Sequence, residues 1–380
     1  MRKLILLTTA ATLCGLAASA QEVSSAPENG VEVSAVARFD VNPYFPLESG
    51  SEMDLSFGNT SIYTFIDGTF GRGWSYSVSN HWMGVSWYMN APEEKMAPLY
   101  SNSFHSNSTD WIDWATISYD LDAGNAGVWT FTVGKDMMAL GLSEFEANDV
   151  DMHYDLSSFF WNGAPIEMEE DTWFAEGMQV YQWGGSIGWT SPSEGTNLRF
   201  QMSSSPYAVW PYKDAKMAFA LQLNEFQGPW TGRFSVNAVG DYLDYDADGS
   251  PYGSSWWRYF ALGQSLAFGD LTIDLDAMMR GRTWKTPFEE TLATLKLQYD
   301  FGEKASLFAK GGWEMFGYNP DEPGYRLDAF WGGIGAHWFP LRDSQALRVH
   351  AIVAANSPYK QLSVNVGITY NLCISDFWNK

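Results

Sequence analysis

Polar and apolar residues alternate along long stretches of this chain. In residues 361–372 the two sets fall on opposite faces of an extended strand. One face carries Leu362, Val364, Val366, Ile368, Tyr370 and Leu372, and the other carries Gln361, Ser363, Asn365, Gly367, Thr369 and Asn371. Segments 271–282 and 291–301 repeat the pattern. Alternation over ten or more residues exceeds the usual soluble strand of about five or six residues. It fits the roughly 9–11 residues of a tilted strand that crosses a bilayer.

About sixteen such segments follow one another, which predicts an all-β fold. They lie near residues 31–41, 60–69, 74–85, 113–122, 128–136, 175–190, 197–204, 216–225, 231–241, 257–268, 271–283, 291–301, 305–317, 327–339, 346–354 and 361–372. No apolar run approaches the roughly 20 residues of a membrane helix. A polar second face that includes charges suits a water-filled lumen, so we expect a transmembrane antiparallel β-barrel. A secreted β-sandwich or propeller would also alternate and stays as the alternative.

The connectors between these segments are short and long in turn. Short ones include 71–73, 227–229, 269–270 and 302–304. Long ones lie at 86–112, 137–174, 205–215, 242–256 and 318–326. Outer-membrane barrels have short periplasmic turns and long extracellular loops. An even strand count then predicts both mature termini on the periplasmic side.

The connector after Lys135 is the longest and the most acidic. It holds Glu144, Glu146, Asp149, Asp151, Asp155, Glu167, Glu169, Glu170 and Asp171, and no Lys or Arg occurs between Lys135 and Arg199. Long loops in compact proteins are usually functional or disordered, and the aromatic content of this one argues against disorder. We expect loop 137–171 to fold into the barrel mouth and narrow it. The expected constriction comprises Lys135, Glu144, Glu146, Asp149, Asp151 and Asp155.

The N-terminus is typical of a secretory signal peptide. A basic pair, Arg2-Lys3, precedes an apolar run from Leu4 to Leu16, and Ala18-Ser19-Ala20 follows as a cleavage site. We expect residues 1–20 to be removed and 21–380 to form the barrel. A lipoprotein reading of Cys14 is disfavoured, because Leu13 precedes it where a small residue is expected. Cleavage would leave Cys373 alone, so no intramolecular disulfide is expected.

Charge and composition narrow the partners. Without Arg2 and Lys3 the chain has 20 basic and 45 acidic residues, a net charge of −25. Nucleic acids and anionic membrane surfaces are poor partners for such a chain. The 19 Trp and 19 Tyr suit the two interfacial girdles of a membrane barrel.

Strand parity places a set of basic residues on the lumenal face. They are Arg38, Arg199, Lys216, Arg233, Arg280, Arg282, Lys296, Lys310 and Arg348. Plain solvation, or pairing with wall carboxylates such as Asp274 and Asp276, is the simpler interpretation. Lys135 has the parity of Phe131 and Val133, the lipid face, where a charge is costly. We expect a β-bulge at Gly134 to turn it inward.

Two motifs suggest other chemistry. Gly184-Gly185-Ser186-Ile187-Gly188 fits the hydrolase elbow G-x-S-x-G, but the elbow needs a strand–turn–helix context and the surroundings here are β. The five His have no zinc-type spacing, and we expect no enzyme. Asp244, Asp246 and Asp248 precede Gly249 as in the start of an EF-hand calcium loop. Ser255 stands where that loop needs Glu, so a solvated acidic loop is the favoured interpretation and structural calcium the alternative.

Residues 133–154 resemble the loop region of porins related to the phosphate-selective porin O/P family, in the form found in Bacteroidota. Gly134-Lys135 ends a strand, and an acidic-aromatic-acidic patch, Glu144-Phe145-Glu146, precedes Asn148-Asp149-Val150-Asp151. The resemblance implies an outer-membrane porin. That family's phosphate selectivity relies on lumenal Arg and Lys, whereas this chain is acidic, so only the porin class is carried over. The tail after Leu372 departs from the aromatic ending of many outer-membrane proteins.

We therefore expect a passive diffusion channel in the bacterial outer membrane for ions and small hydrophilic solutes, without a cofactor. Its environment would be membrane lipid and lipopolysaccharide, and a homotrimer is expected by analogy with general porins. The alternative is a non-conducting barrel with a structural or surface-binding role, whose acidic loops hold calcium or a partner.

Overall fold

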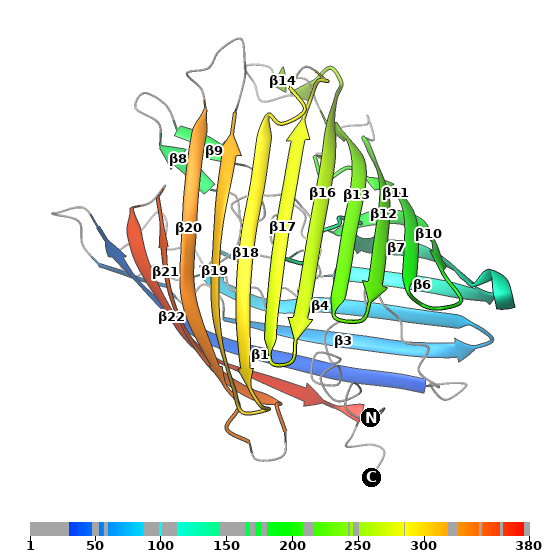
Figure 1. Ribbon diagram of the computed structural model, residues 1–380, viewed down its shortest axis with the longest axis horizontal. Helices are drawn as coiled ribbons and strands as arrows, with labels where there is room; N and C mark the ends of the chain where they lie inside the picture. The colour runs from blue at the N-terminus through cyan, green and yellow to red at the C-terminus, as the bar shows by residue number, and fades with distance from the viewer. Residues whose placement is uncertain are drawn as a thin grey trace.

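The protein is a closed antiparallel β-barrel of sixteen long strands in a computed structural model (Figure 1). The structure describes residues 30–47, 53–56, 60–86, 99–100, 112–144, 164–167, 172–175, 181–207, 216–241, 244–245, 251–284, 286–317, 326–341, 344–357 and 360–375. Within these ranges no helix is long and apolar enough to cross a membrane. The predicted fold class is confirmed.

Each barrel strand pairs with the next one along the chain, and the last pairs with the first. The strands are β1 (Gly30–Pro46), β3 (Thr60–Gly71), β4 (Trp74–Ser86), β6 (Ile112–Asp122), β7 (Val128–Met137), β10 (Tyr181–Thr190), β11 (Thr196–Ser204), β12 (Met217–Gln227), β13 (Trp230–Asp241), β16 (Ser255–Phe268), β17 (Leu271–Gly281), β18 (Glu290–Phe301), β19 (Ala305–Phe316), β20 (Leu327–Trp338), β21 (Leu347–Asn356) and β22 (Gln361–Cys373). β22 closes the ring by pairing with β1 from Ser34↔Cys373 to Pro46↔Gln361. Closure leaves no free sheet edge, which a membrane-spanning sheet requires.

Short strands decorate the loops. β2 (Asp54–Ser56) and β5 (Leu99–Tyr100) add to β1 and β4, and two separate pairs form from β8 (Ala164–Glu167) with β9 (Thr172–Ala175) and β14 (Asp244–Tyr245) with β15 (Pro251–Tyr252). The predicted strand 175–190 is wrong at its start. Its first residue belongs to β9, which pairs with β8 from Ala164↔Ala175 to Glu167↔Thr172, and β10 begins at Tyr181.

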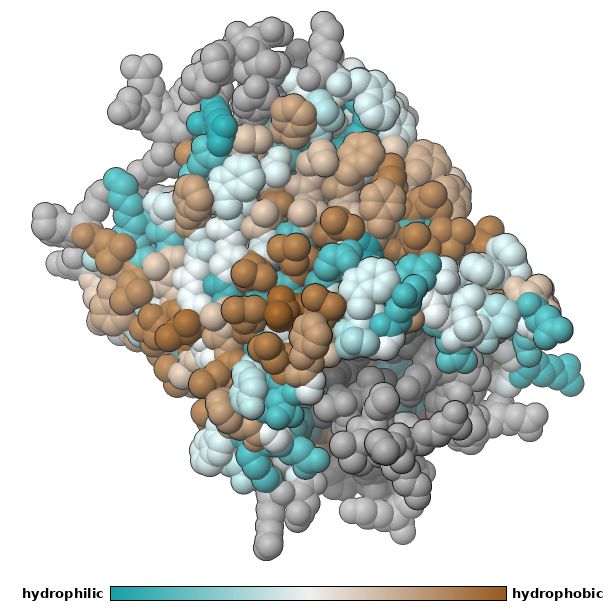
Figure 2. Space-filling view, in the orientation of Figure 1, coloured by the Kyte–Doolittle hydropathy of each residue, from teal (hydrophilic) through white to brown (hydrophobic). Residues whose placement is uncertain are grey.

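The alternation seen in the sequence separates the two faces of the wall. In β17, Leu275 and Met279 are 48% and 41% exposed, whereas Asp276 and Arg280, which directly follow them, are buried. The exposed set forms the outer surface, on which apolar side chains gather across much of the face in Figure 2. A lipid-facing apolar band around a different interior is the pattern of membrane barrels.

The short turns lie at the end of the barrel where β1 begins and β22 ends (Figure 1). Gly302 adopts φ of 61° in the β18–β19 turn, a conformation that glycine reaches without strain. The tail continues the seam, since the Ile374 amide donates to the Val33 carbonyl at 2.7 Å. Ser375 Oγ accepts the Val33 amide at 2.6 Å.

Candidate pore constriction

The chain leaves β7 and runs along the inner wall as the segment Met138–Glu144. Met138, Leu140 and Leu142 are each no more than 1% exposed. The Gly141 position explains how close the segment lies to the wall. A Cβ atom there would stand 2.6 Å from the Phe234 carbonyl carbon of β13, so only glycine fits.

Inward polar side chains of consecutive strands hold this segment by its backbone. The contacts are Gln201 Oε1 from the Ala139 amide at 2.7 Å, Gln201 Nε2 to the Met137 carbonyl at 2.9 Å, Gln222 Nε2 to the Leu140 carbonyl at 3.4 Å, Asn237 Nδ2 to the Ala139 carbonyl at 2.8 Å and Ser235 Oγ from the Gly141 amide at 3.0 Å. They come from β11, β12 and β13 in order. A loop backbone needs hydrogen-bond partners wherever it leaves water, and here the wall supplies them.

The segment ends on a charged group contributed by β17 and β19. Both carboxylate oxygens of Asp276 accept backbone amides, from Ser143 at 2.7 Å and from Glu144 at 2.8 Å. Glu144 then pairs with Lys310, its Oε1 lying 2.8 Å from Nζ. The Lys310 ammonium also stands 5.4 Å from the centre of the Trp331 ring. The arrangement carries an acid from the loop across to a base on the wall.

Lys135 is buried, but the predicted bulge at Gly134 is wrong. The register with β10 and β6 runs without a shift through Gly134. Gly134 instead adopts φ of 136°, which glycine tolerates. The Lys135 Nζ donates to the Ile112 carbonyl at 2.6 Å, and only 3% of the residue is exposed. The lysine thus avoids lipid by satisfying the start of β6.

Most of the predicted lumenal bases lie close to acids or hydroxyls. Arg199 pairs with Asp136, and Arg38 pairs with Asp40. Arg233 Nη1 donates to Ser265 Oγ at 3.1 Å and to Ser143 Oγ at 3.3 Å. Lys296 lies in register between Asp274 on β17 and Lys310 on β19. Lys216 Nζ donates to the Gly253 carbonyl at 3.0 Å.

Arg280 lies in an aromatic cluster near the loop end of β16 and β17. It pairs with Glu290, donates to the Tyr207 hydroxyl at 2.7 Å and stands 4.8 Å from the Trp257 ring centre. Arg282 lies 4.5 Å from the same ring. Burial raises the pKa of the Tyr207 hydroxyl well above its ordinary value, although nearby Arg280 acts in the other direction. Tyr207 therefore stays neutral and joins the β11–β12 loop to the barrel.

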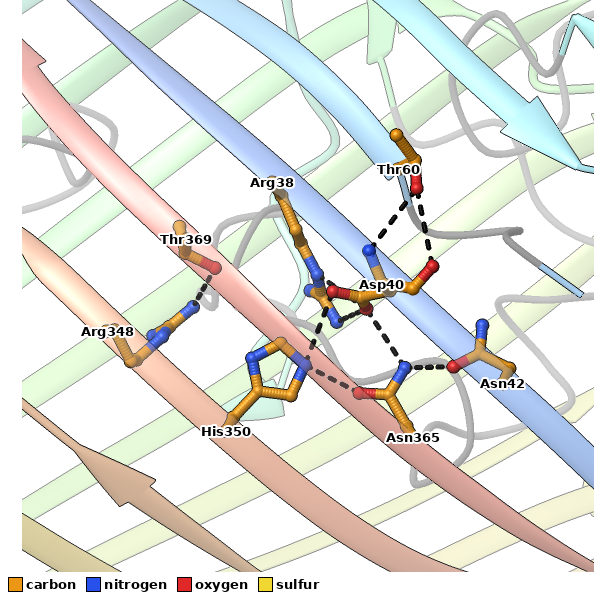
Figure 3. A network of polar contacts seen from close by, with 8 residues as sticks. All are labelled: Arg38, Asp40, Asn42, Thr60, Arg348, His350, Asn365 and Thr369. Atoms are coloured by element: carbon orange, nitrogen blue, oxygen red, sulfur yellow. Dashed lines mark hydrogen bonds and ion pairs between the residues drawn. The ribbon is translucent and has the colours of Figure 1, made fainter.

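A second polar network lies on the opposite side of the interior, where the barrel closes (Figure 3). Asp40 of β1 bonds Arg38 at 2.5 Å and accepts from Asn365 Nδ2 of β22 at 2.9 Å. His350 Nε2 of β21 lies 2.6 Å from Asn365 Oδ1 and 3.3 Å from Asp40 Oδ1. Arg348, nearby on β21, donates to Thr369 at 3.5 Å. Asp40, His350 and Asn365 are at most 1% exposed.

The interior is not polar throughout, although the polar second face of the strands predicted a water-filled lumen. An apolar cluster occupies inward positions toward the loop ends. It includes Val239, Trp257, Tyr259, Met278, Leu292, Phe316, Trp331, Ile352 and Ala354 with Met138, Leu140 and Leu142 of the loop. Inward positions nearer the short turns are polar, for example Asp274, Gln298 and Ser306.

Several predicted residues lie outside the described part of the chain. These are Glu146, Asp149, Asp151, Asp155, Asp246 and Asp248. Asp244 is described as part of β14 only. Ser186 of the hydrolase-like motif lies in mid-strand, paired with Thr132 on β7 and Gln201 on β11, so the turn that the elbow needs is missing.

The residues that dock the loop were not predicted from the sequence, and of the closing network only Arg38 and Arg348 were. Gln201, Gln222, Ser235 and Asn237 carry no charge, and strand parity alone marks them as inward. Asp276 was named only as a partner for wall bases. Each of these residues is a polar inward position between two apolar outward ones. This pattern predicts that the side chain points into the barrel, but it does not predict which loop the side chain contacts.

Comparisons with known proteins bear on the fold. No protein-family model matches the chain, and no curated protein sequence matches it. The solved structures that resemble it include the outer membrane channel DcaP of Acinetobacter baumannii, at 11% identity and a TM-score of 0.56 over 90% of this chain and 97% of that one. An anion-selective porin from Comamonas acidovorans has 13% identity and a TM-score of 0.54, covering 90% of this chain and 100% of that one. The trimer form of OmpT, an outer membrane protein of Vibrio cholerae, has 12% identity and a TM-score of 0.54 over 90% and 99%. At such identities the likeness concerns the fold: this chain has the sixteen-stranded barrel of outer-membrane porins.

Proposed function

We propose that the protein is a porin of the bacterial outer membrane, a passive diffusion channel for ions and small hydrophilic solutes. The observation that carries the proposal is the segment Met138–Glu144, bound along the inner wall and ending on the Glu144–Lys310 pair. A loop held inside a barrel reduces its free cross-section, and fixed charges at a constriction control which solutes pass.

Single-channel recording in planar bilayers tests this function. The purified barrel should give stepwise conductance in salt solution without any added ligand or nucleotide. A barrel that inserts, migrates differently on gels before and after boiling, and yet gives no steps would contradict the porin function. The orientation would be tested by cysteine labelling on whole cells, in which loops 86–112 and 242–256 should react and turns 71–73 and 302–304 should not.

We further propose that the acidic loop sets a modest preference for cations. Glu144 at the end of the segment pairs with Lys310, and three further loop acids, Glu146, Asp149 and Asp151, follow within seven residues. Opposed charges in a narrow wet passage create a transverse field, and the excess of acids favours cations. A variant with Glu144→Gln, Glu146→Gln, Asp149→Asn and Asp151→Asn should lose the preference in a salt-gradient reversal potential. Anion preference in the wild type would exclude the proposed sign, whatever the phosphate-porin resemblance or the anion-selective neighbour suggests.

The runner-up is a non-conducting barrel with a structural or binding role. The apolar interior cluster favours it, because Trp257, Phe316 and Trp331 are buried rather than wetted. The same recording separates the two functions. Calcium at Asp244, Asp246 and Asp248 would belong to this second function, and a change of melting temperature with added calcium would reveal it. A homotrimer, suggested by the trimer form of OmpT, is testable by mass in detergent.

A further inference from the structure

The basic residues of the barrel strands almost all lie on inward positions and have protein partners. Arg38, Arg199 and Arg280 pair with carboxylates, and Lys310 pairs with Glu144. Lys135 has outward parity, but it is buried and bonded to a carbonyl. A charge on the lipid side is costly, so an outward base that is neither buried nor paired with a carboxylate requires an explanation.

Arg258 of β16 is that base. It lies between the buried, inward Trp257 and Tyr259 and shares its outward face with Trp256 and Leu262, which are 39% and 45% exposed. Its neighbours in register are small, Ala238 on β13 and Gly281 on β17. Among the residues that the structure describes, Arg258 forms no ion pair.

The site lies at the boundary between the apolar belt and the loops. Arg258 is the fourth residue of β16, at the strand end away from the short turns, and the outward positions below it are Phe260 and Leu262. Trp256 and the 71% exposed Trp284 flank it. Tryptophan gathers where a barrel leaves the hydrocarbon layer, which is the depth of lipid headgroups.

The guanidinium is held in place before any ligand arrives. Its carbon stands 4.9 Å from the centre of the Trp284 ring, and Nη1 donates to the Arg282 carbonyl at 2.5 Å. A guanidinium has five N–H donors, so this bond leaves others for an anion. Stacked arginine suits phosphate, which it can bind through two parallel hydrogen bonds.

We propose that Arg258, stacked on Trp284, binds the phosphate group of a membrane lipid. Because the proposed function puts the loop end outside the cell, the lipid would be the phosphorylated glycolipid of the outer leaflet. This leaflet assignment rests on that function, whereas phosphate binding at Arg258 does not. The phosphate would supply a negative charge next to the Arg258 guanidinium, which has no ion-pair partner among the described residues.

The test compares wild type, Arg258→Gln and Arg326→Gln by the thermal unfolding of the barrel in detergent, titrated with diphosphorylated lipid A. Arg326 is a matched control, because it is a loop-end arginine that already pairs with Asp328. We expect lipid A to raise the unfolding temperature of wild type and Arg326→Gln equally. Arg258→Gln should need roughly tenfold more lipid for the same rise, as expected when a charged hydrogen bond is lost. Lipid A stripped of its phosphates should have little effect on any of them.

Other arms make the outcome decisive. Inorganic phosphate at equal concentration should produce no rise, and a rise equal to that with lipid A would replace the lipid by a free anion. Equal titration curves for wild type and Arg258→Gln would overturn the site. If Arg258→Gln does not fold, Trp284→Ala replaces it and should weaken the effect by removing the stacking partner. Wild type that binds lipid A but never conducts would refute the channel and leave the lipid site standing.

Discussion

Two sides of the barrel interior use the same kind of strand for different purposes. On the β11–β19 side, inward polar residues bond the backbone of the loop, as Gln201, Asn237 and Asp276 do. At the β21–β22–β1 seam, inward polar residues bond one another, as Asp40 and Asn365 do. Both sides show the same alternation of polar and apolar residues. Alternation therefore determines which way a residue points, whereas the group that it contacts determines its role.

Breaking the polar network at the β21–β22–β1 seam should lower the stability of the barrel more than any other change considered. Asp40→Leu should leave Arg38 buried without its carboxylate, and removing one partner of a buried pair typically costs about 3–5 kcal/mol. The free energy of unfolding in urea, measured in lipid vesicles, should fall accordingly, and the heat-modifiable band should weaken.

A double variant, Arg38→Met with Asp40→Leu, provides the control. It removes both charges, so most of the lost stability should return. A single variant as stable as wild type would mean that the seam network does not stabilise the closed barrel.

The next effect loosens the loop and spares the barrel. Asp276→Ala removes the acceptor of the Ser143 and Glu144 amides, each bond to a charged group being worth about 1.5–3 kcal/mol. Single-channel traces should become noisy, with several open levels, while the heat-modifiable band persists. Asp274→Ala, two residues away on the same face, should keep a single level. Equal noise in both variants would show that Asp276 has no special role in docking.

A smaller effect concerns charge alone. Glu144→Gln keeps the shape of the side chain and removes the negative partner of Lys310. The reversal potential should move toward anions at low salt, and the shift should shrink near 1 M, where the Debye length is about 3 Å. Glu303→Gln, in the β18–β19 turn, should leave it unchanged. A shift of the same size in both variants would point to overall charge and not to the constriction.

The smallest difference is expected between two hydrogen bonds that hold the loop, one long and one short. Gln222 donates to the Leu140 carbonyl at 3.4 Å, a long bond, whereas Asn237 donates to the Ala139 carbonyl at 2.8 Å. Weak bonds contribute little, so Gln222→Ala should leave the current noise at the wild-type level and Asn237→Ala should raise it. The reverse order would mean that these distances do not measure how firmly the loop is held.

The sequence predicts the fold well because lipid and interior impose opposite demands on alternate residues. All sixteen segments became barrel strands, and Leu275 and Asp276 fell on the faces that their parity indicates. The sequence does not predict where strands end near the loops, as the 175–190 segment shows. Its first residue pairs with β8 as part of β9 and does not extend β10. The prediction of a bulge at Gly134 was wrong, because Lys135 is kept from lipid in another way. Gly134 adopts φ of 136° within a regular register, and the Lys135 ammonium donates to a backbone carbonyl. The residues that dock the loop could not be predicted, because they bind backbone groups and every residue of the chain has such groups.

The seam has a consequence for the order of assembly. The Asn365–Asp40 bond joins residues 325 positions apart, and the His350–Asp40 contact spans nearly as much of the chain. Such distant contacts form late, since the chain must first give up the entropy of a very large loop. Every other strand pairing could exist in an open sheet, but this network requires β22 to have met β1. The network therefore forms only once the ring has closed. Its presence distinguishes a finished barrel from an insertion intermediate that already has all of its hairpins.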